Sequence, residues 1–553
     1  MTDKPSRRKS WSYTLLILSA VLGATLAGGV FGDRLLGSPV QGEFQKRLRE
    51  YTEVLSAAAE WSAEDVGYEK LVYSSIEGML RTLDPHSAFL EPRDYSEMQE
   101  RQKGTFYGLG ILVTKRNERV TVITPLEGTP AARLGIRAGD IIAEVEGVST
   151  DDLPLDDVVR RLKGPKGTTV NIKIMRVGIE EPIPLSIVRA SIPTNSISNV
   201  LMVKPGVGYI RIKDFTQTTV RELDDAIEKL DKQGMKKLVL DLRLNPGGLL
   251  DAAVGVADHF VRKGEMIVYT RGRTPDSFQE FVAPGKHRRV DVPLIVLIDR
   301  GSASASEIVA GAVQDHDRGL VVGETSWGKG LVQSVYTLQY GAGLALTTSK
   351  YFTPAGRNIQ RDYSSFYDYY VADETANDEV PLSERQVFKT DVGRKVYGGG
   401  GITPDVVVKR RQLSRVAQLL EVRSAIFNYA VEYNARHADV SHEMKITPAI
   451  MDDFANYAAS KEIAPLAEIL ESMTNPTDRN YLERSLKAEI IAAKYGYDAS
   501  YAYRLEGDDQ VAKALEVFPE AEKLATLANE MRSKAIAANR TGRGNNASAV
   551  KNE

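Results

Sequence analysis

Three serines stand where an apolar segment typical of a buried strand meets a predicted helix. Residues 299–333 read DRGSASASEIVAGAVQDHDRGLVVGETSWGKGLVQ and contain Ser302, Ser304 and Ser306. The first turn of a helix has free backbone N–H groups and a partial positive charge, which favour both a nucleophile and an oxyanion site. The same segment also fits a simpler role, because residues 304–307 read SASE and match the S-x-x-E capping box. On this segment alone, helix capping is the stronger interpretation.

A lysine between two glycines offers a second reactive group. Lys329 lies in the sequence GKG after a short predicted strand, and the glycines let the backbone pass close to another segment. A serine nucleophile needs an adjacent base. Lysine has an ordinary pKa of ~10.4, but burial in an apolar pocket disfavours its charged form. Trp327, Leu331 and Val332 could supply such a pocket and favour the neutral form of Lys329.

Other interpretations of these residues remain open. A Walker phosphate loop requires Ser or Thr after the lysine, where Gly330 stands, so that motif does not match. A Ser-His-Asp triad would use His316, but a helix places His316 about three turns away from Ser304 at its N-terminus. A surface lysine beside a serine that only caps a helix is the third interpretation.

The composition excludes several other chemistries. The 553 residues include no cysteine, which rules out disulfides, a thiol nucleophile, zinc–thiolate sites and a lipoprotein anchor. The six histidines form no HExxH motif, so we do not expect a metalloprotease site. We also expect no cofactor. The net charge of −3 gives no sign of a nucleic-acid partner. At ~150 residues per domain, the length predicts three or four domains.

The N-terminal segment, residues 1–38, predicts export. Four cations precede an uncharged stretch over residues 10–32, and ~20 helical residues are enough to cross a bilayer. A signal peptide cleaved near residues 25–27 and an uncleaved anchor with its cations in the cytoplasm both fit this pattern, with the anchor slightly favoured. Either way, the bulk of the chain is expected outside the cytoplasm.

The rest of the chain divides into segments that differ in the spacing of their hydrophobic residues. Residues 39–100 are predicted to be helical. Residues 101–190 follow the order glycine loop, strand, short helix, GDxI turn, helix and strand, which resembles a PDZ domain. Consecutive N–H groups in the loop Gly108-Leu109-Gly110-Ile111 would bind a peptide's terminal carboxylate, and the adjacent strand edge would add the peptide as an extra strand.

Buried strands alternate with helices in the next segment. Residues 191–410 contain continuous apolar runs at 238–242 and 292–298, which are typical of a sheet covered on both faces, so the predicted class is α/β. An acidic, tyrosine-rich stretch over 361–390 reads as a surface insertion. Residues 411–533 are predicted to be helical, and residues 534–553 to be a disordered tail.

Seven segments, taken in order, resemble the carboxyl-terminal processing proteases, also called tail-specific proteases. They are LDPHSAFL (83–90), the PDZ segment, LDLRLNPGG (240–248), GSASASEIVAGA (301–312), GETSWGKGLVQ (323–333), YFTPAGRNIQ (351–360) and GGGGITPD (398–405). The resemblance implies an exported serine endopeptidase with a crotonase-like α/β protease core, an inserted PDZ domain and helical N- and C-terminal regions. It also implies a place on the periplasmic side of the inner membrane.

The resemblance assigns roles to individual positions. It makes Ser304 the nucleophile, Lys329 the general base and Gln333 the residue that orients the lysine. The implied oxyanion donors are the backbone N–H of Ala305 and of a glycine within residues 245–248, with Gly247 favoured. The implied supporting residues are Glu307, Asp241 and Arg243, although an ion pair explains Arg243 equally well. Arg176 would link the PDZ domain to the active site, and no metal is implied.

The expected partners are proteins or peptides with free, apolar C-termini, which the PDZ domain would recognise while it gates the protease. An adaptor protein and self-association are compatible with the sequence. One alternative is a non-catalytic, membrane-anchored PDZ scaffold in which the serines only cap a helix. Another is an acyl-CoA-handling enzyme on a similar core, which the PDZ segment and the export signal disfavour because CoA chemistry is cytosolic.

Overall fold

A computed structural model of the chain describes residues 39–364, 369 and 381–549. The predicted signal or anchor segment over 1–38, and residues 365–368 and 370–380 of the acidic insertion, lie outside this part. Among the described residues, no helix combines the length and the apolar character needed to cross a membrane. The chain separates into two compact units, with the boundary between Phe89 and Leu90.

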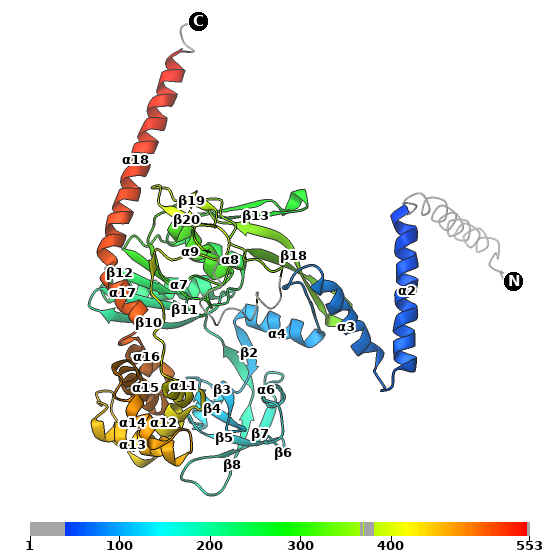
Figure 1. The fold of residues 1–553 in the computed structure, drawn as a ribbon, viewed down its shortest axis with the longest axis vertical. Helices are drawn as coiled ribbons and strands as arrows, with labels where there is room; N and C mark the ends of the chain where they lie inside the picture. The colour runs from blue at the N-terminus through cyan, green and yellow to red at the C-terminus, as the bar shows by residue number, and fades with distance from the viewer. Residues whose placement is uncertain (1–38, 365–368, 370–380, 550–553) are drawn as a thin grey trace, which may run out of the picture. The chain divides into compact units, whose positions relative to one another are not determined.

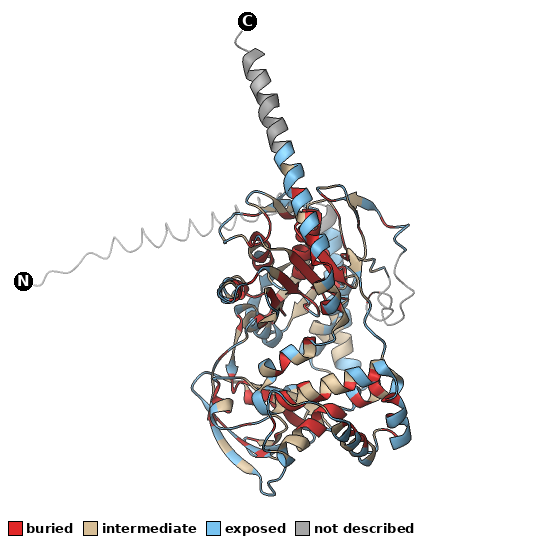
Figure 2. Ribbon diagram, turned by 90° about the vertical axis from the view of Figure 1, so that its left-hand side faces the viewer, coloured by how far each residue is buried: buried red, intermediate tan, exposed pale blue. Residues whose placement is uncertain are grey.

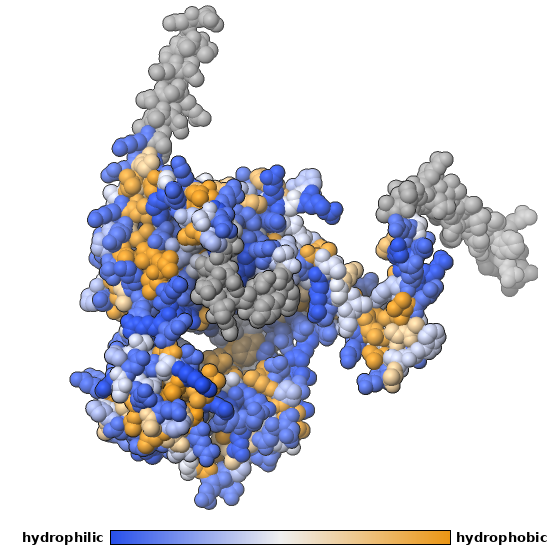
Figure 3. All heavy atoms as spheres, in the orientation of Figure 1, coloured by the Kyte–Doolittle hydropathy of each residue, from blue (hydrophilic) through white to orange (hydrophobic). Residues whose placement is uncertain are grey.

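The first unit is built from two helices, α2 (Pro39–Trp61) and α3 (Tyr68–Arg81), and β1 (Ala88–Leu90) spans the boundary between the units. Hydrophobic side chains gather on the surface of this unit (Figure 3). They include several exposed residues of α2, namely Phe44, Leu48, Tyr51, Val54 and Trp61.

The helical N-terminal region predicted over 39–100 does not form one unit. Helix α4 (Pro92–Lys103) belongs to the second unit, because its side chains bond to that unit. Tyr95 shares a hydroxyl–hydroxyl hydrogen bond of 2.6 Å with Thr337, and Arg101 forms an ion pair of 2.7 Å with Asp214.

A six-stranded sheet forms the centre of the second unit, in the order β10-β11-β12-β15-β16-β21. Its strands are β10 (Ile197–Lys204), β11 (Val207–Ile212), β12 (Lys237–Asp241), β15 (Leu294–Ile298), β16 (Leu320–Gly323) and β21 (Val406–Val407). Strands β10 and β11 pair antiparallel, and every later pair is parallel. The parallel strands are the continuous apolar runs of the sequence, so the predicted α/β class is confirmed.

Helices cover both faces of this sheet, and its central strands are buried throughout (Figures 1 and 2). Alternate side chains serve the two faces: Leu238 and Leu240 pack toward α7 (Thr219–Lys232), α8 (Leu250–Asp258) and α9 (Ala305–Asp315). Val239 packs on the other face, toward α16 (Tyr497–Leu505), α17 (Asp509–Glu516) and α18 (Phe518–Ala549). Because burial of one such side chain contributes ~1.5–3 kcal/mol, the last helices of the chain help to stabilise this sheet.

A second sheet was not predicted from the sequence. Strand β18 (Gly343–Phe352) pairs antiparallel with both β17 (Leu331–Thr337) and β13 (Met266–Gly272), and β13 pairs with β14 (Gln279–Val282). A short hairpin of β19 (Val387–Lys389) and β20 (Lys395–Tyr397) follows.

The PDZ region is an insertion whose two ends pair with each other. Strand β2 (Thr105–Gly108) enters and β9 (Ala190–Pro193) leaves, and the two are antiparallel partners. Between them lies a sheet in the order β3-β4-β5-β7-β8, with β6 paired to β5. These elements are β3 (Ile111–Arg116), β4 (Arg119–Pro125), α5 (Pro130–Arg133), β5 (Ile141–Val145), β6 (Val148–Ser149), α6 (Leu155–Leu162), β7 (Thr169–Met175) and β8 (Ile183–Val188).

The remaining helices form a separate apolar cluster. They are α11 (Arg415–Val422), α12 (Ala425–Arg436), α13 (Pro448–Ser460), α14 (Leu466–Ser472) and α15 (Pro476–Tyr495). The disordered tail predicted over 534–553 is wrong as far as Ala549, because α18 continues to that residue. The alanines that follow Ser533 have high helix propensity, and extending an existing helix needs no new nucleus.

Candidate active site

Three loops meet at one edge of the parallel sheet. Residues 242–249 follow β12, residues 299–304 follow β15, and residues 324–330 follow β16, and these three strands are neighbours. The carboxyl ends of parallel strands are where open α/β sheets bind their ligands. The topology therefore brings Ser304, in the second loop, to the same edge as Lys329, in the third.

Ser304, Lys329 and Gln333 line one pocket of about 430 Å³. Pockets of about 300–1,000 Å³ are usual for bound ligands. Leu331 and Val332 supply part of the apolar wall, as predicted. Trp327 takes another position, since its indole N–H donates to the Tyr369 hydroxyl at 3.4 Å.

Ser304 has a strained backbone at the start of α9. Its φ of 53° and ψ of −112° lie outside the regions that non-glycine residues usually occupy. Strain of this kind is concentrated at functional sites, where the surrounding structure maintains it. The predicted Ser304–Glu307 capping box is present, so Ser304 caps the helix and also faces the pocket.

Glu307 fixes both sides of the site. Its Oε2 accepts hydrogen bonds from the backbone N–H of Ser304 at 2.7 Å and of Lys329 at 2.9 Å. Its Oε1 accepts from the Ser326 hydroxyl at 2.5 Å and from the Gly328 N–H at 2.7 Å. Burial raises the pKa of this carboxyl, and the four hydrogen bonds oppose that rise.

Lys329 and Gln333 both reach the pocket. Lys329 precedes β17, and Gln333 lies within β17 just after a register shift between Val332 and Gln333. The Lys329 Nζ donates to Gln333 Oε1 at 3.0 Å. The amide Nε2 of Gln333 is buried and has no hydrogen-bond partner among the described residues.

The glycine loop after β12 passes against Ser304. A Cβ added to Gly247 would lie 2.8 Å from the Ser304 Cβ and 2.9 Å from the Ala305 nitrogen, so only glycine fits there. Gly247 is the glycine that the sequence analysis favours as an oxyanion donor, but its N–H already donates to Asn245 Oδ1 at 2.9 Å.

The peptide between Gly247 and Gly248 has a different orientation. Its carbonyl accepts from the Phe215 N–H at 3.0 Å, and in a trans peptide the N–H of Gly248 points the opposite way. Within the described residues, neither the Gly248 N–H nor the Ala305 N–H donates a hydrogen bond. Both glycines, Ala305 and Ser304 line the pocket.

The predicted carboxylate loop precedes an edge strand of the PDZ sheet. Strand β3 is at the end of its sheet and pairs with β4 alone. The carbonyl of Leu109 accepts from Ala131 at 3.1 Å and that of Gly110 accepts from Leu126 at 2.8 Å. In the described structure, the N–H groups of Leu109 and Gly110 donate no hydrogen bond, as a carboxylate-binding loop requires.

Comparison with known proteins identifies the family. A match to Peptidase family S41 spans residues 206–364, and a match to the PDZ domain family spans residues 121–176. A carboxy-terminal-processing protease of Bartonella bacilliformis is 43% identical over 296 residues, which cover 53% of this chain and 68% of that protein. The chain belongs to peptidase family S41.

A second relative agrees with this assignment. This chain is 32% identical over 361 residues to the carboxy-terminal processing protease CtpA of Bacillus subtilis. The match covers 64% of this chain and 76% of that protein. The solved structure of a photosystem II D1 C-terminal processing protease is 30% identical, covers 65% of this chain and 86% of its own, and has a TM-score of 0.34. The S41 peptidase is therefore a serine peptidase with an embedded PDZ domain.

Two predicted supporting residues of the S41 peptidase lie apart from the pocket. Arg243 binds Asp241 through its Nη2 at 2.6 Å, and its Nη1 reaches Asp508 at 2.8 Å and Gln510 at 3.0 Å. The pair therefore joins the sheet to the start of α17, and the ion-pair interpretation of Arg243 fits the structure better. Glu307 is the one predicted supporting residue that bonds directly to the segments of Ser304 and Lys329.

Arg176 and His316 also have other partners. Arg176 forms two hydrogen bonds of 2.7 Å to Asp140, so it braces the PDZ domain internally. His316 has the Asp391 carboxylate 3.0 Å from Nδ1 and the Met266 carbonyl 2.7 Å from Nε2. Both ring nitrogens are engaged at the far end of α9, so a Ser-His-Asp triad with Ser304 does not form.

The sequence did not reveal two residues that support the site of the S41 peptidase. The Tyr351 hydroxyl donates to the Ser304 carbonyl at 3.1 Å, and burial next to Glu307 raises the pKa of this tyrosine. Ser326 connects Glu307 to the glycine-rich segment at residues 398–405, because its hydroxyl donates to Glu307 and accepts from the Ile402 N–H at 2.7 Å. Tyr351 and Ser326 both lie within segments that resemble the protease family, and that resemblance was the signal that could have identified them.

Proposed function

We propose that this peptidase cleaves exported proteins at or near their C-termini with a Ser304–Lys329 dyad. The supporting observation is the shared pocket, in which Lys329 Nζ donates to Gln333 Oε1 at 3.0 Å. A neutral lysine has one free lone pair, and a fixed hydrogen bond to Gln333 directs it. The apolar wall of Leu331 and Val332 favours the uncharged amine.

The proposed reaction has two halves. Lys329 takes the proton from the Ser304 hydroxyl while Oγ forms a bond to the scissile carbonyl carbon. The C–N bond then breaks, and Lys329 returns the proton to the leaving amine nitrogen. Water next attacks the acyl-enzyme, gives its proton to Lys329, and expels Ser304 Oγ, which recovers that proton.

The proposed oxyanion donors are the backbone N–H groups of Ala305 and Gly248. Both line the pocket beside Ser304 and neither donates elsewhere within the described residues. Gly248 is preferred to Gly247, whose N–H is held by Asn245. Such preorganised donors stabilise the charge that develops in the transition state by about 2.7–4 kcal/mol each.

The dyad is tested by single substitutions assayed on a peptide with an apolar free C-terminus. Ser304→Ala and Lys329→Ala are each expected to reduce kcat at least ~10³-fold, and Gln333→Ala by ~10–100-fold. Ser334→Ala and Lys350→Ala are matched controls, because both residues lie on the same sheet but outside the pocket wall. Wild-type turnover by folded Ser304→Ala or Lys329→Ala would refute the assignment.

The PDZ domain is proposed to bind the free C-terminus of the substrate. The unused N–H groups of Leu109 and Gly110 would receive the carboxylate, and the peptide would extend along the edge of β3. In the Ser304→Ala protein, a free-acid peptide is expected to bind at least ~10-fold more tightly than its C-terminal amide. Equal affinities would exclude recognition of the carboxylate.

Export to the periplasmic side of the inner membrane is proposed from the basic, then apolar, segment over residues 1–38. Cell fractionation locates the protein, and N-terminal sequencing of the purified protein separates an anchor from a cleaved signal peptide. Recovery in the cytoplasmic fraction would contradict the proposal.

A further inference from the structure

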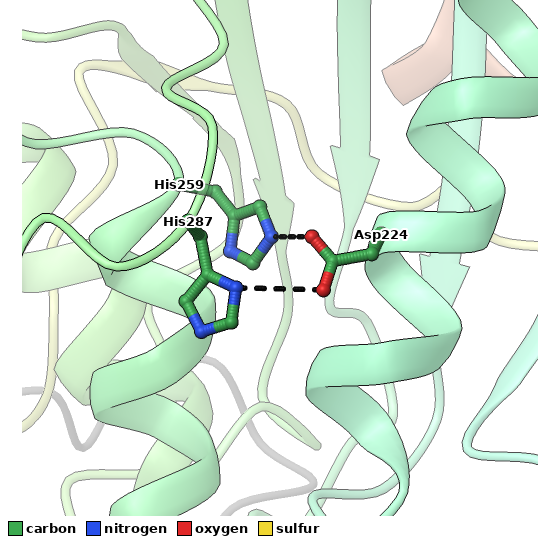
Figure 4. Close-up of side chains that lie close together, drawn as sticks. All are labelled: Asp224, His259 and His287. Atoms are coloured by element: carbon green, nitrogen blue, oxygen red, sulfur yellow. Dashed lines mark hydrogen bonds and ion pairs between the residues drawn. The ribbon is translucent and has the colours of Figure 1, made fainter.

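Two histidines and an aspartate converge on the helical face of the core, outside the wall of the active-site pocket (Figure 4). Asp224 lies on α7, His259 directly follows α8, and His287 lies on the loop before β15. One donor atom from each residue lies within 4.8 Å of the other two. The sequence spacing gave no signal for this cluster, because its members lie on three separate elements.

The hydrogen bonds of His259 define what its ring can do. Its Nδ1 is 2.9 Å from the Gly255 carbonyl, which can only accept, so Nδ1 must carry a hydrogen. The other nitrogen, Nε2, lies 2.8 Å from Asp224 Oδ1. An imidazole lone pair and a carboxylate oxygen repel each other at this distance unless a cation, either a proton or a metal ion, lies between them.

His287 completes the group from the other oxygen of Asp224. Its Nδ1 lies 3.4 Å from Asp224 Oδ2, and its ring stacks on His259 with a centroid distance of 4.6 Å. The loop that carries His287 is fixed by the buried Asp258. That carboxylate accepts from the backbone N–H of Gly285, Lys286 and His287 at 2.7, 2.9 and 3.2 Å.

We propose that Asp224, His259 and His287 bind one zinc ion. Two imidazoles and a carboxylate form a common zinc ligand set, with water completing the coordination. In a tetrahedral site with bonds of ~2.0 Å, ligand atoms are about 3.3 Å apart, so the observed separations require only small side-chain movements. The backbone carbonyl on Nδ1 is the outer partner that metal-bound histidines usually have.

The proposed zinc site is accessible to solvent, and a bound ion would act by linking separate elements of the fold. The Asp224 side chain is 47% exposed and that of His287 is 26% exposed, so an ion can enter from solution. A bound ion would join α7, the end of α8 and the following loop. Since α8 begins just after Gly248, zinc would fix the distal end of the helix that leads from the glycine loop. This proposal does not depend on the proposed peptidase mechanism.

The test is zinc binding by the full-length protein after treatment with EDTA and removal of the chelator. Calorimetric titration with ZnCl₂ is expected to show one saturable equivalent. His287→Ala and Asp224→Asn are each expected to weaken binding at least ~10-fold. Cobalt(II) at the same site should give the visible absorption of a low-coordinate ion, which both variants should lose. Zinc should also raise the Tm of the parent protein but not of His287→Ala.

The matched control is His442→Ala, which removes an exposed histidine outside the cluster and should leave the titration unchanged. Circular dichroism of each variant establishes that it is folded before titration. Two partially exposed ligands are tested so that one unstable variant does not decide the result. Absence of saturable binding, or equal binding by the parent and both variants, would overturn the zinc site and assign a proton to the His259–Asp224 contact.

Discussion

The backbone N–H groups of Ser304 and Lys329 donate to the same oxygen, Oε2 of Glu307, at 2.7 and 2.9 Å. The other oxygen of Glu307 holds Ser326 and Gly328. One buried carboxylate therefore sets the separation of two loops that follow different strands. The geometry of the proposed dyad depends on a residue that takes no part in proton transfer.

Substitution of Glu307 by Gln tests this dependence. Both carboxylate oxygens accept from two donors, so the NH₂ group of glutamine must face groups that also donate. We expect kcat to fall ~10²-fold or more, with a much smaller change in KM, because a small misplacement of reacting groups costs about that factor. Loss of satisfied hydrogen bonds should also reduce the free energy of unfolding by about 1–3 kcal/mol. Glu324→Gln, in the same loop region, is the matched control, and unchanged kcat in Glu307→Gln would refute the positioning role.

Gly247→Ala tests the close approach of the glycine loop. The new Cβ would lie 2.8 Å from both the Ser304 Cβ and the Ala303 carbonyl oxygen, at a φ of 102°. The clash should displace Ser304 and remove most activity. Gly264→Ala is the matched control, because Gly264 has a φ of 84° and no atom within 4 Å of an added Cβ. It should lose only about 1–2 kcal/mol of stability from the left-handed backbone and retain its kcat.

Local patterns predicted the elements that position the site. Continuous apolar runs at 238–242 and 292–298 identified β12 and β15. The dyad segments were found because family motifs recur there, whereas the serine segment alone favoured helix capping as the role of Ser304. The structure shows both roles at once, since a capping box positions Ser304 on the pocket wall.

Contacts between distant segments could not be read from the sequence. Strand β18 pairs with β13, which lies about 80 residues earlier, and no local period encodes that pairing. The structural role of the Asp241–Arg243 pair depends on its contact with Asp508. The N–H of Gly247 is engaged because it donates to Asn245, whereas Phe215 donates to the Gly247 carbonyl and leaves the N–H of Gly248 unused. The C-terminal helices were predicted as helices, but their packing on the sheet required the three-dimensional arrangement.

Arg243→Met tests the assignment of the Asp241–Arg243 pair to stability. The substitution leaves the fully buried Asp241 without its principal partner, and breaking a buried pair costs about 3–5 kcal/mol. Urea unfolding should show that loss, while turnover per folded molecule stays close to the parent value. Arg288→Met removes an exposed ion pair with Asp231 and should cost at most ~1 kcal/mol. A loss of turnover in folded Arg243→Met would instead indicate a role in the active site.

His316 predicts a pH dependence of stability that is separate from catalysis. Burial lowers the pKa of His316, but its hydrogen bonds to Asp391 and the Met266 carbonyl, with the charges of Glu265 and Asp391, raise it above the ordinary ~6.5. Arg532 also lies beside His316, since it donates hydrogen bonds to the His316 carbonyl and to the Asp391 carboxylate.

A pKa raised by folding stabilises the native state fully below the unfolded-state pKa, and this contribution disappears as pH rises through the folded-state pKa. The difference in unfolding free energy between the parent and His316→Gln should therefore be larger at pH ~5.5 than at pH ~9. Urea denaturation at both pH values measures it, with the exposed His442→Gln as the control. Turnover by folded His316→Gln should remain near the parent value. A stability difference that grows with pH would show that His316 is held neutral, and a collapse of turnover would return the Ser-His-Asp triad to consideration.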